Sequence, residues 1–548
     1  MLPLLFLAVV SPLVVFLLAL KNKQQCCRGI PLPPGCPRLP LHWSLFGLSP
    51  TVASLSMVLR RLHHAHGPVV TLCAGSKPAI FIASHETAHC TLVRMGATFA
   101  HRPSSSLLSS GVNGYGVNSA TYGSRWTLLR RNLCSHLAAA DIAGPLRLSV
   151  DRLLGNLERA AREAADGVVV PSDTLRHAVF RFFAALCFGE QAIADAAADD
   201  DGGGGVLTRL RGLHAEILSL VVELDALHLM PSMALQVAHY LPRSWKLFDA
   251  QRRHHNIVMT LVRARRRWQQ NMVGVGVGVG DDDGGGTVLP PQCYVDTLLR
   301  LRLGDHELME QLKEAWRFTE CDCQDGNWST ALEWIMARLV LHQDIQHKLW
   351  NDIAGGSRRS ATCGGGERRS FAEAVVLEAL RRHPPAHYLL AHTTDRDVSL
   401  HGSSYVIPKG SIVNYGVAEI GRDAKLWTDP DVFSPERFLE GGEGSSIRGI
   451  PSVSSGGLEP ETMKMIPFGA GRRACPGAAV SVKVLLSFME NMVVQFEWKP
   501  VVGCGCDSCG GKNEAPAVDM SEKPGLVTEM RTPLRTRLVV RQHVDEQT

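Results

Sequence analysis

The sequence has no excess of charge of either sign and no long basic tract. Its 548 residues include 57 basic and 53 acidic side chains, for a net charge of +4. Proteins that bind a phosphate backbone usually carry clustered basic residues, so we expect no nucleic-acid partner. Aromatic residues are also few, at 6%, yet 45% of residues are hydrophobic and 20% are charged. This composition excludes wholesale disorder and a polytopic membrane protein.

A disulfide framework is missing as well. The fifteen cysteines are odd in number and irregular in spacing, which favours reduced thiols in a protein that faces the cytosol. The sequence shows no dinucleotide fingerprint, because the alternating glycines of 274–280 lack the required spacing and follow no strand. Electrons for any redox reaction must then come from a partner protein.

One long apolar run is present, over Met1–Leu20. A helix of about 20 residues crosses the hydrocarbon core of a bilayer. Basic residues follow the run and none precedes it, a layout typical of a membrane anchor with the rest of the chain in the cytosol. A cleaved signal or a plastid leader is the alternative. Residues 21–40 form a basic, proline-rich hinge, and residues 41–548 form one globular domain.

The globular part is predicted to be mainly α with a small β subdomain. Apolar residues recur at three- and four-residue intervals and predict helices over Leu128–Leu137, Val150–Ala165, Leu207–Leu227 and Leu308–Leu349. Short runs of β-forming residues predict strands at Val69–Leu72, Ala79–Ile82, Tyr405–Ile407 and Thr536–Val540. Two inserts of glycine and aspartate, at 199–205 and 273–286, are predicted to be solvated loops within the same domain.

The segment Pro467–Gly477 carries the clearest chemical signal. Its glycines predict a tight loop before an apolar helix, with backbone N–H groups directed at the sulfur of Cys475. Such donors stabilise a thiolate, and a thiolate is an axial ligand of haem iron. In the same loop Arg473 can pair with a haem propionate, and Phe468 can shield the sulfur from water.

This loop resembles the haem-binding signature of the cytochrome P450 family. Glu378 and Arg381 match the family's Glu-x-x-Arg helix, and their spacing places both side chains on one helix face. Arg437, in the sequence Pro-Glu-Arg-Phe, resembles the arginine that completes this ion-pair triad in the family. The resemblance implies a cytochrome P450 fold behind the N-terminal transmembrane anchor.

Further positions resemble the plant microsomal members of the family. Trp126 and Arg130 match a Trp-x-x-x-Arg helix whose two side chains face the haem propionates, and His392 stands where another basic propionate partner is usual. The run Arg381–His387 is shared with one branch of these enzymes.

The resemblance implies a monooxygenase that uses haem b, O2 and a small apolar organic substrate. Its electrons would come from NADPH-cytochrome P450 reductase, and the protein would be single-pass in the endoplasmic reticulum membrane. We also expect a basic docking face for the reductase among Lys464, Arg472, Arg473 and Lys483.

The segment Cys323–Trp328 departs from the family pattern. Family members place an acid and a threonine here for proton delivery to dioxygen, but this chain has Gly326 and Asn327. Three hypotheses follow. Asp325 or Asn327 holds water in a different proton route; or monooxygenation is lost, leaving a peroxide-rearranging or non-catalytic haem protein; or the segment reflects an error in the gene model.

One rival motif indicates a different chemistry. His85, Glu86 and His89 spell the His-Glu-x-x-His pattern of zinc proteases, in which the two histidines bind zinc and the glutamate acts as a base. The extended metal-binding pattern is missing downstream. A zinc hydrolase is therefore a remote alternative, and a surface helix after the Ala79–Ile82 strand is favoured.

Overall fold

The computed structural model describes most of the globular part of the chain. The described residues are 31–35, 52–74, 77–103, 116–118, 120–198, 205–226, 233–274, 292–301, 303–304, 307–308, 311–312, 327–355, 369–400, 404–447, 460–501, 518–523, 525 and 527–541. The expected anchor at 1–20, most of the hinge and Asp325 lie outside these ranges.

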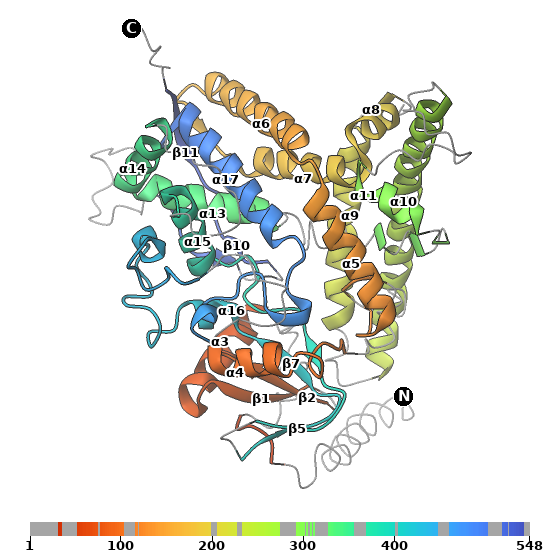
Figure 1. Ribbon diagram of the computed structural model, residues 1–548, viewed down its shortest axis with the longest axis vertical. Helices are drawn as coiled ribbons and strands as arrows, with labels where there is room; N and C mark the ends of the chain where they lie inside the picture. The colour runs from red at the N-terminus through yellow and green to blue at the C-terminus, as the bar shows by residue number, and fades with distance from the viewer. Residues whose placement is uncertain are drawn as a thin grey trace, which may run out of the picture.

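Helices make up most of the molecule (Figure 1). They are α3 (Val52–His66), α4 (His85–His89), α5 (Ser124–Ala139), α6 (Ala143–Glu163), α7 (Ser172–Phe188), α8 (Glu190–Ala198), α9 (Val206–Ala226), α10 (Met233–Gly274), α11 (Tyr294–Arg300), α13 (Asn327–Leu341), α14 (Gln343–Ala354), α15 (Phe371–Arg382), α16 (Val417–Gly421) and α17 (Ala478–Gln495).

The strands form small, separate sheets. The largest has the order β1-β2-β7-β4, from Val69–Ala74, Lys77–Ile82, Ile412–Tyr415 and His392–Thr393. A three-stranded sheet joins β3 (Val168–Val169), β11 (Thr536–Val540) and β8 (Phe496–Pro500). Two short pairs complete the set: β5 (Val398–Ser399) with β6 (Val406–Ile407), and β9 (Glu522–Lys523) with β10 (Glu529–Met530).

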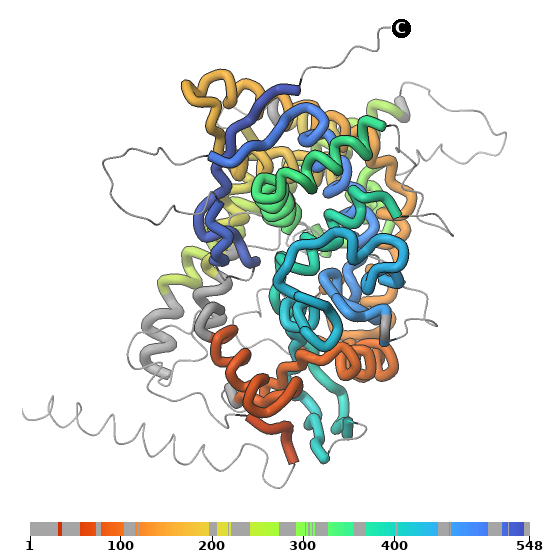
Figure 2. Tube along the Cα trace, turned by 90° about the vertical axis from the view of Figure 1, so that its left-hand side faces the viewer, coloured from red at the N-terminus to blue at the C-terminus, as the bar shows by residue number. Residues whose placement is uncertain are grey.

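Segments far apart in the sequence meet in the largest sheet. β2 pairs in parallel with β7, with Ile80 opposite Val413, while β1 and β2 form an antiparallel pair. Both views place this N-terminal segment beside the segment around residue 412, at the end of the molecule opposite α6 (Figure 2). The sheet therefore closes one end of the fold and carries His392 on its edge strand β4.

The core lies between α6, α7, α13, α15 and α17, whose apolar side chains form one buried cluster. α13 and α15 bury residues on nearly all sides, as expected of central helices. The Ser370 side chain caps α15 by accepting a hydrogen bond from the Glu373 N–H at 3.1 Å. Pro384 and Pro385 follow the end of α15 and prevent its continuation.

The fold confirms the predicted mainly helical class and corrects one helix. The periodicity over Leu308–Leu349 predicts one continuous element, but α13 ends at Leu341 and α14 begins at Gln343. His342, between them, has φ −110° and ψ 78°, outside the helical region. Apolar spacing continues across such a break because both helices pack on the same core, so periodicity alone does not detect it.

Among the described residues, α17 alone is long and apolar enough to cross a membrane. It is 61% buried inside the protein and contributes to the central cluster, so we assign it to the core. The membrane anchor predicted at 1–20 stays a prediction.

Candidate active site

The cysteine loop adopts the tight turn that its glycines predict. Gly469 and Gly471 both have φ of +67°, which side chains rarely tolerate. A Cβ on Gly471 would lie 1.9 Å from the Leu92 carbonyl oxygen, so no other residue fits there. The Cys475 N–H donates to the Phe468 carbonyl at 2.8 Å, and α17 begins at Ala478. The loop thus holds Cys475 at the start of a long helix.

Cys475 lies in the wall of an internal cavity of about 500 Å³. Burial raises the pKa of the Cys475 thiol, while the Gly477 N–H and the charge of Arg130 lower it. Burial is the largest influence, so the thiol without a metal stays protonated at neutral pH. A bound cation reverses this balance, because a coordinating thiol loses its proton.

The rest of the cavity wall is largely apolar, with a cationic side. Phe183, Leu186 and Ala331 are among its apolar side chains. Arg102, His392 and Arg473 are among its positive or potentially positive groups. A buried thiol, apolar walls and cations gathered in one cavity match the needs of a planar apolar group that carries carboxylates.

Arg473 is held firmly at this cavity. Its guanidinium donates to the carbonyls of Ala100 at 2.7 Å, Val117 at 2.9 Å and Ala120 at 2.5 Å. Its charge also lies 4.7 Å from the centre of the Trp126 ring. Arg473 therefore belongs to the interior and is unavailable to the exposed docking face suggested by its sequence position.

His392 is almost fully buried, and its Nδ1 lies 2.7 Å from the Phe99 carbonyl oxygen. A carbonyl only accepts, so Nδ1 carries the proton and Nε2 of the neutral ring is bare. Burial, then the charge of Arg102, lowers the pKa of His392 to about 3. A carboxylate also only accepts, so pairing with a propionate requires a second proton on His392, which the propionate charge favours.

Trp126 and Arg130 lie behind the loop instead of lining the cavity. Trp126 Nε1 donates to the Val117 carbonyl at 2.8 Å, and the Arg130 guanidinium donates to the Ala474 carbonyl. The first contact holds the Val117 carbonyl, which Arg473 also contacts. The second holds the carbonyl of Ala474, the residue that follows Arg473. Their expected approach to propionates stays a prediction.

Glu378 and Arg381 form a fully buried bidentate ion pair, with N–O distances of 2.7 and 2.8 Å. Arg437 approaches the same carboxylate, its Nε lying 3.6 Å from Glu378 Oε1. The closer partner of Arg437 is Glu443, a contact that the sequence did not indicate. Arg381 also donates to the carbonyls of Gly421 and Pro430, both at 2.9 Å. The cluster joins α15 to the loop around Pro430.

The start of α13 reaches the cavity. Asn327 and Trp328 both line it, and Asn327 Oδ1 is buried without a hydrogen-bond partner among the described residues. The Trp328 ring packs on Phe183 with 4.1 Å between centres, and its Nε1 donates to Ser481 Oγ at 2.8 Å. Ser481 in turn donates to the Gly477 carbonyl at 2.8 Å. Trp328 thereby links α13 to the cysteine loop.

The sequence did not indicate a role for two residues of the cavity wall, Arg102 and His387. Arg102 donates to the Leu390 and Ala391 carbonyls, both at 2.9 Å, a contact across the fold that no local spacing encodes. His387 lines the cavity and ends a run that the sequence analysis noted without assigning it a role. The available signal was a histidine two residues after the pair of prolines that follows a helix.

The zinc motif occupies α4, where Glu86 is exposed and His89 is buried. His89 therefore faces the protein interior, so only the side of the helix that carries Glu86 lies at the surface as expected. The described residues contain no group of three or more side chains suited to hold a metal ion.

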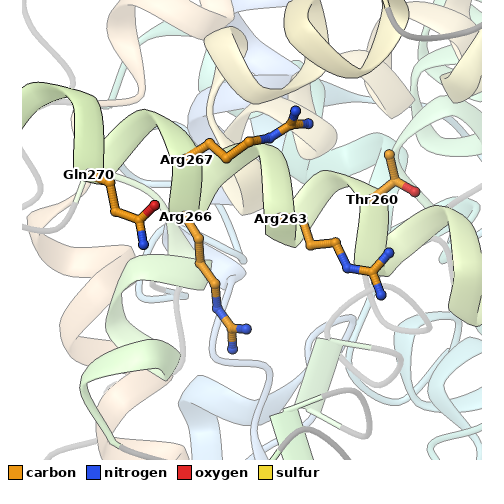
Figure 3. Close-up of a pocket in the computed structure, with 5 residues that line it drawn as sticks. All are labelled: Thr260, Arg263, Arg266, Arg267 and Gln270. Carbon is orange, nitrogen blue, oxygen red and sulfur yellow. The ribbon is translucent and has the colours of Figure 1, made fainter.

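A second hollow, of about 510 Å³, is lined by described residues of α10 alone (Figure 3). Arg263, Arg266 and Arg267 dominate it. It contains no thiol and no apolar wall among these residues, so it does not suit haem.

Comparison with known proteins agrees with the geometry of the cysteine cavity. The cytochrome P450 family model matches residues 33–269 and 327–509. Cytochrome P450 89A9 of Arabidopsis thaliana is 32% identical, over 93% of this chain and 94% of its own length. A flavonoid 3'-monooxygenase of the same plant is 26% identical, over 97% and 96%.

Solved structures show the same fold. A retinoic acid-bound cyanobacterial CYP120A1 has a TM-score of 0.67 at 18% identity, covering 94% of this chain and all of its own. A zebra fish cytochrome P450 with progesterone has a TM-score of 0.62 at 19% identity, covering 88% and 99%. The matches in sequence and fold, together with the cysteine in the cavity wall, show that the chain belongs to the cytochrome P450 family.

Proposed function

We propose that this protein is a haem-thiolate monooxygenase that oxidises a small, mainly apolar organic molecule. Its family supports a haem monooxygenase in general. The observation that carries the proposal is the placement of Cys475 in the wall of a largely apolar cavity that also contains basic side chains, among them Arg102, His392 and Arg473. We further propose NADPH-cytochrome P450 reductase as electron donor and the endoplasmic reticulum membrane as location.

Each wall of the cavity has a separate task in this proposal. Cys475 would hold the haem iron, and Arg473 and His392 would hold the propionates. The bound haem would supply the activation of dioxygen. Phe468, half-buried beside the cysteine, would keep water from the sulfur.

Apolar side chains line the part of the cavity that would bind the substrate. The Phe183 and Trp328 rings pack against each other and present an aromatic surface to the cavity. Such a surface favours flat or alicyclic molecules over charged ones, because desolvating a charge inside the cavity is costly. The enclosure also limits access of water to the reacting atoms.

Proton delivery would rely on Asn327, with Asp325 as the neighbouring acid. The buried, unpartnered Oδ1 of Asn327 is suited to hold a water molecule at the cavity. An amide can position such a water but cannot release a proton of its own near neutral pH.

Replacement of the proposed ligand tests the function directly. We expect the Cys475→Ser variant to lose the strongly red-shifted carbonyl-difference band that thiolate ligation gives in this family, because a serine hydroxyl does not replace the thiolate. Reduced wild-type protein with bound haem should show the band. Haem-loaded wild-type protein without that band, or a variant that keeps it, would contradict the proposal.

A second candidate function is a haem protein without turnover. The observation in its favour is that residues 270–326, which include the altered segment, fall outside the family match. Consumption of NADPH with added reductase, compared with the product formed, separates the two functions.

A further inference from the structure

His387 is a buried side chain at the cavity for which the proposed mechanism has no use. It follows the two prolines after α15, and its backbone carbonyl accepts the Val417 N–H at 2.8 Å. The residue is 5% exposed and lines the same cavity as Cys475. Its Nε2 is buried, and the described residues offer no hydrogen-bond partner for it.

A carboxylate lies next to that nitrogen. Glu522 Oε2 is 3.7 Å from His387 Nε2, and Glu522 Oε1 is 3.7 Å from His383 Nδ1. Arg422 anchors the carboxylate through a 2.7 Å contact to Oε1. Burial alone would raise the pKa of Glu522, but His383, His387 and Arg422 hold it well below its usual range. Glu522 is therefore a fixed negative charge beside the ring.

The position of Glu522 depends on the C-terminal strand pair. Glu522 opens β9, which pairs with β10, and Met530 lies opposite Glu522. The Thr528 N–H donates to the Pro385 carbonyl at 2.8 Å, which attaches this strand pair to the segment that carries His387. The carboxylate thus approaches the ring from the side of the β9 and β10 pair.

The charge beside Nε2 decides which ring nitrogen carries the proton. Burial lowers the pKa of His387 to about 4, although the Glu522 carboxylate acts in the opposite direction. The ring is therefore neutral near pH 7 and has one N–H group. A carboxylate only accepts, so the N–H is favoured at Nε2, and Nδ1 is left as a bare acceptor. None of the described residues donates a hydrogen bond to His387 Nδ1.

We propose that His387 Nδ1 accepts a hydrogen bond from a hydroxyl group of the substrate, with Glu522 as the positioning residue that sets the tautomer. This inference rests on the proposed function and specifies its substrate class: a small apolar molecule that carries a hydroxyl donor. A site that offers an unpaired acceptor discriminates against molecules that lack the donor.

Three naphthalene probes of similar size separate the possibilities. 2-Naphthol can donate, 2-methoxynaphthalene can only accept, and 2-methylnaphthalene can do neither. For the haem-loaded full chain, we expect 2-naphthol to bind about tenfold more tightly than the other two, measured by calorimetric titration. Equal binding of 2-naphthol and 2-methylnaphthalene would refute the hydroxyl contact, and an equal gain for 2-methoxynaphthalene would assign it to a donor in the cavity.

Variants locate the acceptor. His387→Phe should abolish the preference for 2-naphthol. His136→Phe tests the rival acceptor, because His136 lines the same cavity and its Nε2 is also buried without a partner among the described residues. We expect His136→Phe to keep the preference, and a preference lost there and kept in His387→Phe would assign the contact to His136. A preference that survives in His387→Phe would overturn the inference.

Glu522→Gln tests the positioning role. The amide permits either tautomer of His387, so the discrimination between 2-naphthol and 2-methoxynaphthalene should shrink. Unchanged discrimination would remove Glu522 from the inference. Failure of the haem signature in wild-type protein would defeat the proposed function itself, whereas intact haem spectra with indifferent binding of the probes would defeat only this inference.

Discussion

Asn327 stands where the sequence analysis expects the family's threonine, and it lies at the proposed reaction site. Asn327 lines the cavity, and its Oδ1 is buried without a hydrogen-bond partner among the described residues. Trp328, the next residue, is turned toward Phe183 and Ser481 and fills space with an indole. In the proposed function, proton supply at this point would depend on this amide and on water that it holds.

We predict that the double change Gly326→Asp with Asn327→Thr raises the product formed per NADPH several-fold. The acid and hydroxyl would supply a proton path that the amide supplies poorly. Product and released peroxide, measured with added reductase, check this outcome.

Asn327→Leu is the opposing variant, since it removes the polar group at similar size. It should lower the product yield and raise peroxide release. Unchanged yields in both variants would show that protons reach the site by a path independent of Asn327.

At the scale of the element, the buried helix α15 is linked through its side chains to segments that follow it in the chain. Glu378 and Arg381 lie on the same helix face, and Arg381 donates to the carbonyl of Gly421, at the end of α16, and to that of Pro430 in the loop beyond. The Ser434 N–H also donates to Glu378 Oε1 at 3.0 Å. One carboxylate thus fixes a helix and the segment before the cysteine loop, far from solvent.

We predict that Glu378→Gln destabilises the protein by about 3 kcal/mol, because it leaves the buried Arg381 charge without its partner. Thermal or urea unfolding of the haem-loaded protein measures the loss. The matched control is Glu436→Gln, which breaks an exposed pair with Lys348, whose side chains are 49% and 51% exposed.

The control should change the free energy of unfolding by less than about 1 kcal/mol. Equal losses of unfolding free energy in the two variants would show that the buried Glu378–Arg381 pair stabilises the protein no more than the exposed pair.

At the scale of the molecule, two of the four basic residues expected to form a docking face around the cysteine loop are exposed. Arg473 is turned inward, and Lys464 Nζ donates to the Glu443 carbonyl at 2.9 Å. Lys483 on α17 and Arg472 are exposed, and Arg472 contacts the Tyr122 hydroxyl at 2.5 Å. Lys483 is therefore the clearest candidate for contact with an acidic reductase.

We predict that Lys483→Glu slows reduction by the reductase about tenfold at low salt, with a smaller effect at high salt. Reversing a charge at a docking face reduces the association rate, and salt screens that effect. Stopped-flow reduction of the haem-loaded protein measures the rate.

Lys409→Glu is the control, an exposed lysine in the turn between β6 and β7, on the sheet-bearing end of the fold. It should leave the rate unchanged. A similar slowing in both variants would indicate a general effect of net charge and no defined docking face.

Sequence alone determined what is encoded by neighbouring residues. The cysteine loop needs its glycines within a few positions of Cys475, and Glu378 meets Arg381 through one helical turn. Local geometry fixes such relations, so spacing predicts them. The mainly helical class follows for the same reason, from apolar periodicity.

Only the tertiary structure decided which distant groups share the cavity. The contacts of Arg102 with the segment before β4, and the approach of Glu522 to His387, join residues far apart in the chain. The inward turn of Arg473 likewise depends on carbonyls of an earlier segment. Packing of helices and strands sets these distances, and no periodicity or spacing within one element carries that information.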